Sequence, residues 1–128
     1  MPYTQRLLKP FQGSVPVIHF GTRTSPFLDS FAAAGGDVIG IDHHIGLAEA
    51  WSRIGPNKAI QGNMDPRFLL AGGPAMELEV RKILDEAGSR PGHIFNLGHG
   101  VPPEAPVENV KALVDRVHQY SARKEAVG

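Results

Sequence analysis

Short apolar runs alternate with longer amphipathic segments along this chain of 128 residues. Four runs of strand length, rich in Val, Ile and Phe, lie at 15–20, 37–41, 58–62 and 93–97. Runs of this length and composition are typical of strands buried on both faces of a parallel sheet. The pattern therefore predicts four strands, each buried on both sides.

Segments of helical periodicity follow the strands, and a short amphipathic segment at 2–9 precedes them. Their apolar positions recur at the three-and-four spacing of one helix face. The four stripes are Phe27, Leu28, Phe31 and Ala32; Leu47, Ala50, Trp51 and Ile54; Met76, Val80, Ile83, Leu84 and Ala87; and Val107, Val110, Val114 and Val117. Glycines end three of these segments, at 35–36, 55 and 88, which is a common helix stop signal.

The predicted order is a leading helix followed by four βα units. Such alternation with short connections indicates an α/β fold, in which a parallel sheet is wrapped by helices through right-handed crossovers. Four units correspond to half of a (β/α)8 TIM barrel, which needs about 250 residues, and a compact doubly wound domain also fits. The chain enters its first helix directly at Met1-Pro2-Tyr3, with no leading strand, which favours a piece of a larger fold.

The composition of the chain excludes several classes of function. Thirteen Lys and Arg balance thirteen Asp and Glu, so bulk electrostatic binding of nucleic acid or of an anionic membrane is not expected. The absence of cysteine excludes a thiolate nucleophile, a disulfide scaffold and a zinc site with sulfur ligands. No apolar run approaches the roughly 20 residues that span a bilayer, and a cytoplasmic location is expected. Glycine-rich dinucleotide and phosphate loops and the Gly-x-Ser-x-Gly elbow are also absent from the sequence.

Polar residues gather where each predicted strand ends, which is the edge at which parallel α/β folds bind ligands. They are His19, Thr22, Arg23 and Thr24; Asp42, His43 and His44; Gln61, Asn63 and Asp65; and Asn96, His99 and Gly100. We expect His19, Asp42, Asn63 and His99 to share this rim.

For the histidines that precede the last strand, a purely structural role is an alternative to a functional one. His19 lies within an apolar strand, so a core position is as plausible as a functional one. His43 and His44 are adjacent in a segment expected to be extended, so their side chains should point to opposite faces and chelate a metal poorly.

The other polar residues also permit local roles. Asp42 could cap the following helix or belong to a site. Asn63 and Asp65 could form a turn ahead of Pro66, because Asx side chains bond nearby backbone amides. Arg23 could hold a carboxylate or a phosphate, or remain a solvated loop residue.

Among these polar residues, His99 is the strongest candidate for a ligand-binding residue. It lies between Gly98 and Gly100 at the end of the fourth strand, and two flanking glycines would expose the imidazole and let the backbone approach a ligand closely. We therefore predict a ligand-binding role for His99.

Several stretches together resemble the uroporphyrinogen decarboxylase family. The most specific are Gln61-Gly-Asn-Met-Asp-Pro66 and Asn96-Leu-Gly-His-Gly100. The others are Pro16-Val-Ile-His-Phe-Gly21, Gly36-Asp-Val-Ile-Gly40 and Pro106-Val-Glu-Asn-Val-Lys-Ala-Leu-Val114. The resemblance runs from Pro2 to about Arg123 and implies that residues 1–128 are the C-terminal half of the family's (β/α)8 barrel.

The resemblance implies a cofactor-free lyase of haem and tetrapyrrole synthesis, which removes the four acetate carboxyl groups of uroporphyrinogen and leaves coproporphyrinogen. It implies that His99 binds a substrate carboxylate, that no metal is used, and that the enzyme is a homodimer. The family's pyrrole-binding aspartate and its arginine clamps lie in the first half of the barrel, so no catalytic residue is assigned here and the isolated chain is expected to be inactive.

This sequence departs from the family pattern at three positions. Arg23 stands where glycine is usual, His43 where tryptophan is common, and Ala105 where a threonine often caps the last helix. Two alternatives remain open: a half-barrel that acts only by pairing with another chain, and a relative of the zinc-dependent corrinoid methyltransferases. The second alternative lacks the cysteine ligands that its zinc site requires.

Overall fold

A computed structural model describes residues 2–127 of the chain, and the side chains of residues 2–122. Four parallel strands form one sheet in the order β1-β2-β3-β4, with β1 at Ile18–Phe20, β2 at Val38–Gly40, β3 at Ala59–Gln61 and β4 at His93–Ile94. Each strand is hydrogen-bonded, in parallel orientation, to the strand that follows it in the sequence. The four predicted strands are confirmed, although the paired portions are shorter than the apolar runs.

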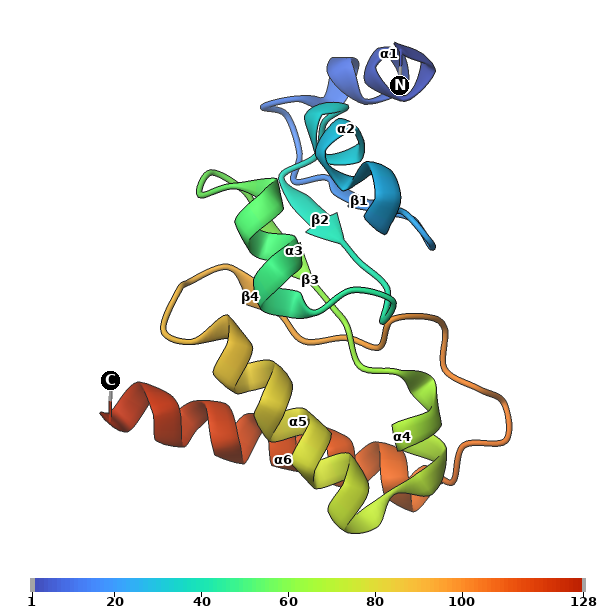
Figure 1. Cartoon of the computed structure of the whole chain (residues 1–128), viewed down its shortest axis with the longest axis vertical. Helices are drawn as coiled ribbons and strands as arrows, with labels where there is room; N and C mark the ends of the chain where they lie inside the picture. Colours follow the sequence, from blue (N-terminus) through green and yellow to red (C-terminus); the bar gives the residue numbers. More distant parts are fainter. Residues whose placement is uncertain (1, 128) are drawn as a thin grey trace.

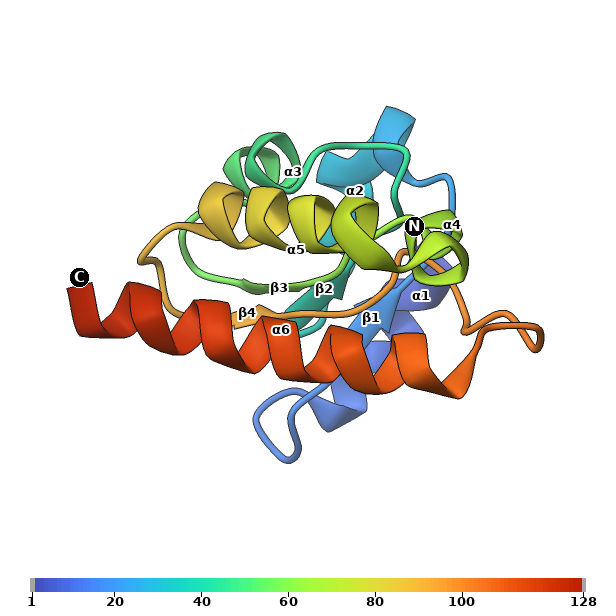
Figure 2. The same ribbon diagram turned by 90° about the horizontal axis from the view of Figure 1, so that it is seen from below.

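The helices alternate with the strands, as expected (Figure 1). They are α1 (Pro2–Leu8), α2 (Leu28–Ala33), α3 (Leu47–Ile54), α4 (Pro66–Ala71), α5 (Gly73–Ala87) and α6 (Val107–Val127), with 3-10 turns η1 (Lys9–Phe11) and η2 (Ser25–Phe27). Helices α2, α3 and α5 lie on the same side of the sheet, and α6 packs against α5 (Figure 2). A leading helix followed by four consecutive parallel βα units is the arrangement of half a (β/α)8 barrel.

The helix α4 is an element that the sequence pattern did not predict. It begins at Pro66 directly after its N-cap Asp65 and ends at Ala71, with Gly72 as its C-cap. Gly72 has a φ of +62°, and a Cβ there would lie 2.6 Å from Oδ1 of Asn109. Because α4 has only six residues, its apolar spacing is too short to stand out from the neighbouring helix.

The side of the sheet that faces the helices forms the core. Ile39 and Ile60 pair across β2 and β3 and are fully buried there. The predicted stripe of α5 is buried along its whole length, from Met76 to Ala87. These elements pack as their periodicity indicates.

The opposite side of β1 and β4 is open. Ile18, Phe20 and Ile94 are 50%, 46% and 42% exposed, respectively. The expectation of strands buried on both faces is therefore wrong for this face, because no layer of the described chain covers it.

The stripe expected on α6 is also partly wrong. Val107 and Val114 are 62% and 47% exposed, whereas Leu113 is buried and Val110 and Val117 pack against the core. The helix meets α5 and α4 with a face that includes Leu113. The run of valines alone therefore misplaced the buried face.

Candidate functional site

A cleft of about 520 Å³ opens at the carboxyl end of the sheet. The loops after β2, β3 and β4 supply its walls, with His43, Asp65, Pro66, Arg67, His99 and residues 100–103. This volume is within the range of small-molecule sites. Side chains far apart in the sequence thus meet where parallel α/β folds bind their ligands.

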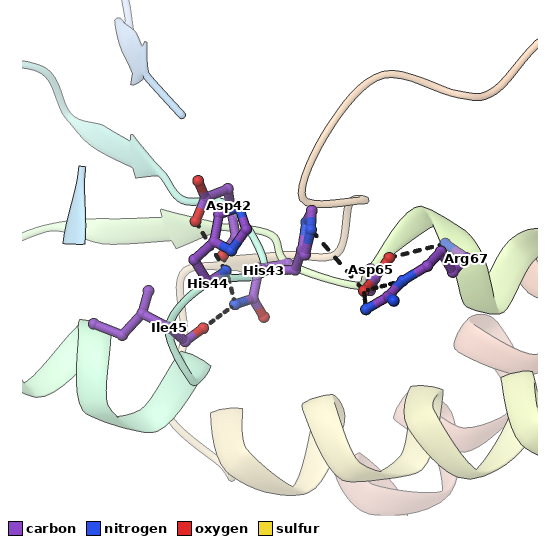
Figure 3. Close-up of polar contacts among 7 residues, drawn as sticks. Asp42, His43, His44, Ile45, Asp65 and Arg67 are labelled. Atoms are coloured by element: carbon purple, nitrogen blue, oxygen red, sulfur yellow. Dashed lines mark hydrogen bonds and ion pairs between the residues drawn. The ribbon is translucent and has the colours of Figure 1, made fainter. Parts of the chain in front are cut away.

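Asp65 and Arg67 both line this cleft. Their side chains are hydrogen-bonded to each other (Figure 3). Oδ1 of Asp65 accepts a hydrogen bond from the Arg67 backbone N–H at 2.9 Å, which caps α4. Oδ2 accepts from Nε and Nη2 of Arg67 at 2.9 and 2.6 Å. Hydrogen bonds from the Arg67 side chain are the main cause of the lowered pKa of Asp65. The expectation that Asp65 bonds a nearby backbone amide is confirmed.

His43 lies beside this pair. Its Nε2 is 4.0 Å from Oδ2 of Asp65, beyond hydrogen-bond reach, and its Nδ1 is buried without a partner among the described residues. The rings of His43 and His44 are 4.5 Å apart, so the expectation that they point to opposite faces is wrong. The segment is a turn and not a strand, which brings adjacent side chains together. The described residues nevertheless contain no group of three His, Cys, Asp or Glu side chains placed to hold a metal ion.

The buried carboxylate of Asp42 links the loop after β1 to the loop after β2. It is 2% exposed, and its carboxylate accepts hydrogen bonds from the backbone N–H of Arg23 and, at 3.0 Å, of His44. Arg23 has a φ of +56°, a left-handed conformation that is uncommon for a residue with a side chain. Since α3 begins at Leu47 with Gly46 as its N-cap residue and no side-chain cap, Asp42 does not cap that helix.

Asn63 joins the loop after β3 to the loop after β2. Its Nδ2 donates to the carbonyl oxygens of Asp42 at 2.9 Å and of Ile45 at 2.6 Å. The local turn expected for Asn63 is therefore replaced by a long-range crosslink. The loops that bear His43 and Asp65 are held in a fixed relation by this buried amide.

His99 is exposed and lines the cleft, in agreement with its expected position. The preceding Gly98 approaches the β2 loop so closely that a Cβ there would lie 2.5 Å from the backbone N of His43. Gly100 has no neighbour within 4 Å of such a Cβ. The close approach that was expected toward a ligand is thus an approach of Gly98 to the protein's own loop.

His19 does not join the cleft. Its ring stacks on Phe31 with a centroid distance of 3.7 Å, and burial lowers its pKa. Of the four residues expected to share the rim, Asp42, Asn63 and His99 meet at the loops, whereas His19 packs against α2. The structure therefore places the His19 ring partly buried against Phe31 of α2, outside the cleft.

Sequence reasoning missed Arg67 and the apolar wall made by Pro66, Val101 and Pro102. A basic residue two positions after an N-capping aspartate is a local signal that could have identified Arg67. The apolar wall carries no comparable signal, because it depends on how the loop after β4 returns over α4.

The parallel order of the strands and the cleft at their carboxyl ends define a protein of the (β/α) barrel class. The uroporphyrinogen decarboxylase family model matches residues 1–120, and the chain belongs to this family. No helix of the described chain is long and apolar enough to cross a membrane.

Individual relatives agree with this assignment. The uroporphyrinogen decarboxylase of Solibacter usitatus is 50% identical over 120 residues, which cover 93% of this chain and 35% of the relative. That of Sorangium cellulosum is 49% identical over 118 residues, which cover 91% of this chain and 34% of the relative. The chain therefore spans about a third of the length of the curated relatives that it matches.

A solved structure shares the fold. A methyltransferase from Methanosarcina mazei superimposes with a TM-score of 0.71 at 27% sequence identity. The match covers 91% of this chain and 35% of the methyltransferase. The same βα arrangement thus occurs in a protein named for a different reaction.

Proposed function

We propose that residues 1–128 act as the C-terminal half of a uroporphyrinogen decarboxylase barrel and supply part of its substrate cleft. The family match over residues 1–120 carries this proposal. The exposed imidazole of His99 in a cleft at the carboxyl ends of the strands supports it.

The reaction proposed is the cofactor-free decarboxylation of the acetate side chains of uroporphyrinogen. Protonation of a pyrrole ring creates an electron sink, so that the electron pair of the broken C–C bond moves into the ring as CO₂ leaves. The exocyclic methylene carbon is then protonated to give a methyl group, and the ring loses the proton that it gained at the start. In this scheme His99 donates a hydrogen bond to a substrate carboxylate and thereby orients the acid.

Complementation tests the proposal. The chain is mixed with a polypeptide that comprises the remaining residues of the Solibacter usitatus relative, and uroporphyrinogen turnover is measured. We expect turnover in the mixture, none from this chain alone, and a loss of turnover when His99→Ala replaces the wild-type chain. Assembly without turnover would favour the alternative in which the chain acts only by pairing.

A second candidate is the corrinoid-dependent methyl transfer named among the sequence alternatives, and the structural match to a Methanosarcina mazei protein named a methyltransferase supports methyl transfer in general. The absence of cysteine from this sequence weighs against it, because the zinc site expected of those relatives uses thiolate ligands. Metal analysis of the purified chain separates the two candidates. Zinc at one equivalent per chain would favour methyl transfer.

We further propose that the chain forms homo-oligomers in the cytoplasm. Ile18, Phe20 and Ile94 leave one side of the sheet apolar and exposed, and β1 and β4 have no strand neighbour on their outer edges among the described residues. Exposed apolar faces and unpaired strand edges both promote association. A second copy, or a complementary half of the barrel, would cover them.

A further inference from the structure

We propose that the cleft is a subsite for a single carboxylate, in which His43 and Arg67 recognise the acid together with His99. The inference rests on the proposed function and deepens it, because it assigns two specificity-determining residues and the chemical group that they select. His43 does not follow from the family pattern, since it stands where the family commonly has tryptophan.

The hydrogen-bond donors that line the cleft suit an anion. Both oxygens of Asp65 are occupied by hydrogen bonds from Arg67, so this carboxylate is already neutralised by its partner. The side chain of Arg67 remains 86% exposed, and its Nη1 has no partner among the described residues. A guanidinium with free N–H groups beside two imidazoles is a set of donors that suits a carboxylate.

The position of His43 is fixed before a ligand arrives. Gly98 lies against its backbone, and a Cβ on Gly98 would fall 2.8 Å from Nδ1. The carbonyl oxygens on either side of the His43–His44 turn, those of Asp42 and Ile45, are held by Asn63. The ring is therefore held at the cleft wall with its Nε2 end near Asp65. Such preorganisation reduces the entropy lost on binding.

The remaining wall is apolar. Pro66, Val101, Pro102 and Pro103 line the cleft together with the polar residues. A flat ring with a short acidic side chain presents an apolar body and one anionic head, which suits a cleft lined by both kinds of residue. The selected ligand class is therefore a carboxylate attached to a small ring.

The test compares two probes of nearly the same shape, one with a carboxylate and the other with a neutral amide in its place. Pyrrole-3-acetate and pyrrole-3-acetamide are titrated into the full chain, and NMR shift changes give the dissociation constants. We expect the wild-type chain to prefer the acetate, and His43→Gln or Arg67→Gln to weaken acetate binding by about tenfold, as the loss of one charge-assisted hydrogen bond predicts. Binding of the acetamide should change little in either variant.

Two matched variants serve as controls. His44→Gln removes the neighbouring imidazole, which does not line the cleft, and Arg53→Gln removes a guanidinium on α3 that pairs with Asp29. Both should bind the acetate as the wild type does. If His43→Gln fails to fold, the exposed Arg67 side chain still provides the test.

The outcomes separate this inference from the proposed function. Equal binding of the acetate and the acetamide, or unchanged acetate binding in both cleft variants, would overturn the carboxylate subsite. In that case, binding of uroporphyrin by the wild-type chain would leave the proposed function standing. Failure of the wild type to bind pyrrole-3-acetate at all would also overturn the subsite, whereas the proposed function is overturned only if the complemented mixture shows no turnover of uroporphyrinogen.

Discussion

Gly98 and His43 are in such close contact that the loops bearing the two cleft histidines are packed against each other. A Cβ on Gly98 would lie 2.5 Å from the backbone N of His43 and 2.8 Å from its Nδ1. The neighbouring His99 therefore takes its position from the loop after β2 as well as from β4. Any side chain at position 98 must displace one of these loops.

Gly98→Ala is expected to destabilise the chain by about 1–3 kcal/mol, because the added methyl group overlaps backbone atoms that cannot move independently. Gly100→Ala, on the other side of His99, should change the free energy of unfolding by less than about 0.5 kcal/mol, since its Cβ would meet nothing within 4 Å. Urea denaturation of both variants measures the difference. Equal effects would show that the loops do not pack as described.

Asp42→Asn is expected to cost about 2 kcal/mol of stability. The buried carboxylate accepts two backbone hydrogen bonds, and an amide would turn a donor toward one of those N–H groups. Asp29→Asn is the matched control, because Asp29 has a side chain that is 74% exposed and pairs with Arg53 at the surface. Urea midpoints that fall equally for both variants would contradict the linking role of Asp42.

His93 should make stability depend on pH. Burial lowers its pKa below the ordinary value of 6.5, so folding favours the neutral imidazole, which bonds to the Gly62 carbonyl oxygen. The unfolded chain therefore binds more protons, and the free energy of unfolding should fall as pH drops below about 6.5. His19 has a pKa lowered in the same direction and adds to the trend.

Urea denaturation between pH 7.5 and about 5 measures this dependence. In His93→Gln, whose amide can still donate to Gly62, the slope should be smaller than in the wild type. Parallel curves for the two proteins would show that His93 does not couple folding to protonation.

His99→Ala, placed in an intact enzyme that contains this segment, should reduce uroporphyrinogen turnover by about tenfold or more while leaving stability nearly unchanged, because the side chain is exposed and contacts substrate in our proposal. Asp37→Asn should retain turnover. Asp37 lies at the amino-terminal end of β2, away from the cleft, where its carboxylate accepts a hydrogen bond from the backbone N–H of Val17. Initial rates and urea midpoints distinguish the two effects. Full activity of the His99 variant would contradict the proposed binding of a substrate carboxylate by His99.

The isolated chain is expected to self-associate through the uncovered side of the sheet. Ile94→Ser should shift the association toward monomer, whereas Leu78→Ser, on the outer face of α5 and 70% exposed, should not. Light scattering after size-exclusion chromatography measures the mass of each variant. A wild-type chain that elutes as a monomer of 13.8 kDa would contradict the prediction.

The sequence by itself determined the order of the strands, the leading helix and the buried faces of α3 and α5. These features depend on periodicity and on glycine stops, which reflect local backbone geometry and need no distant partner. The family motifs similarly marked His99 and Asp65 before their surroundings were known.

Only the tertiary structure decided which side chains meet. Asn63 bonds to a carbonyl 18 residues away and Asp42 to an amide 19 residues away, and nothing in the local pattern selects those partners. The exposure of Phe20 and Ile94 likewise depends on which layers cover the sheet. Local periodicity indicates which face of an element is apolar, whereas burial and hydrogen-bond partners are set by the packing of segments that are distant in the sequence.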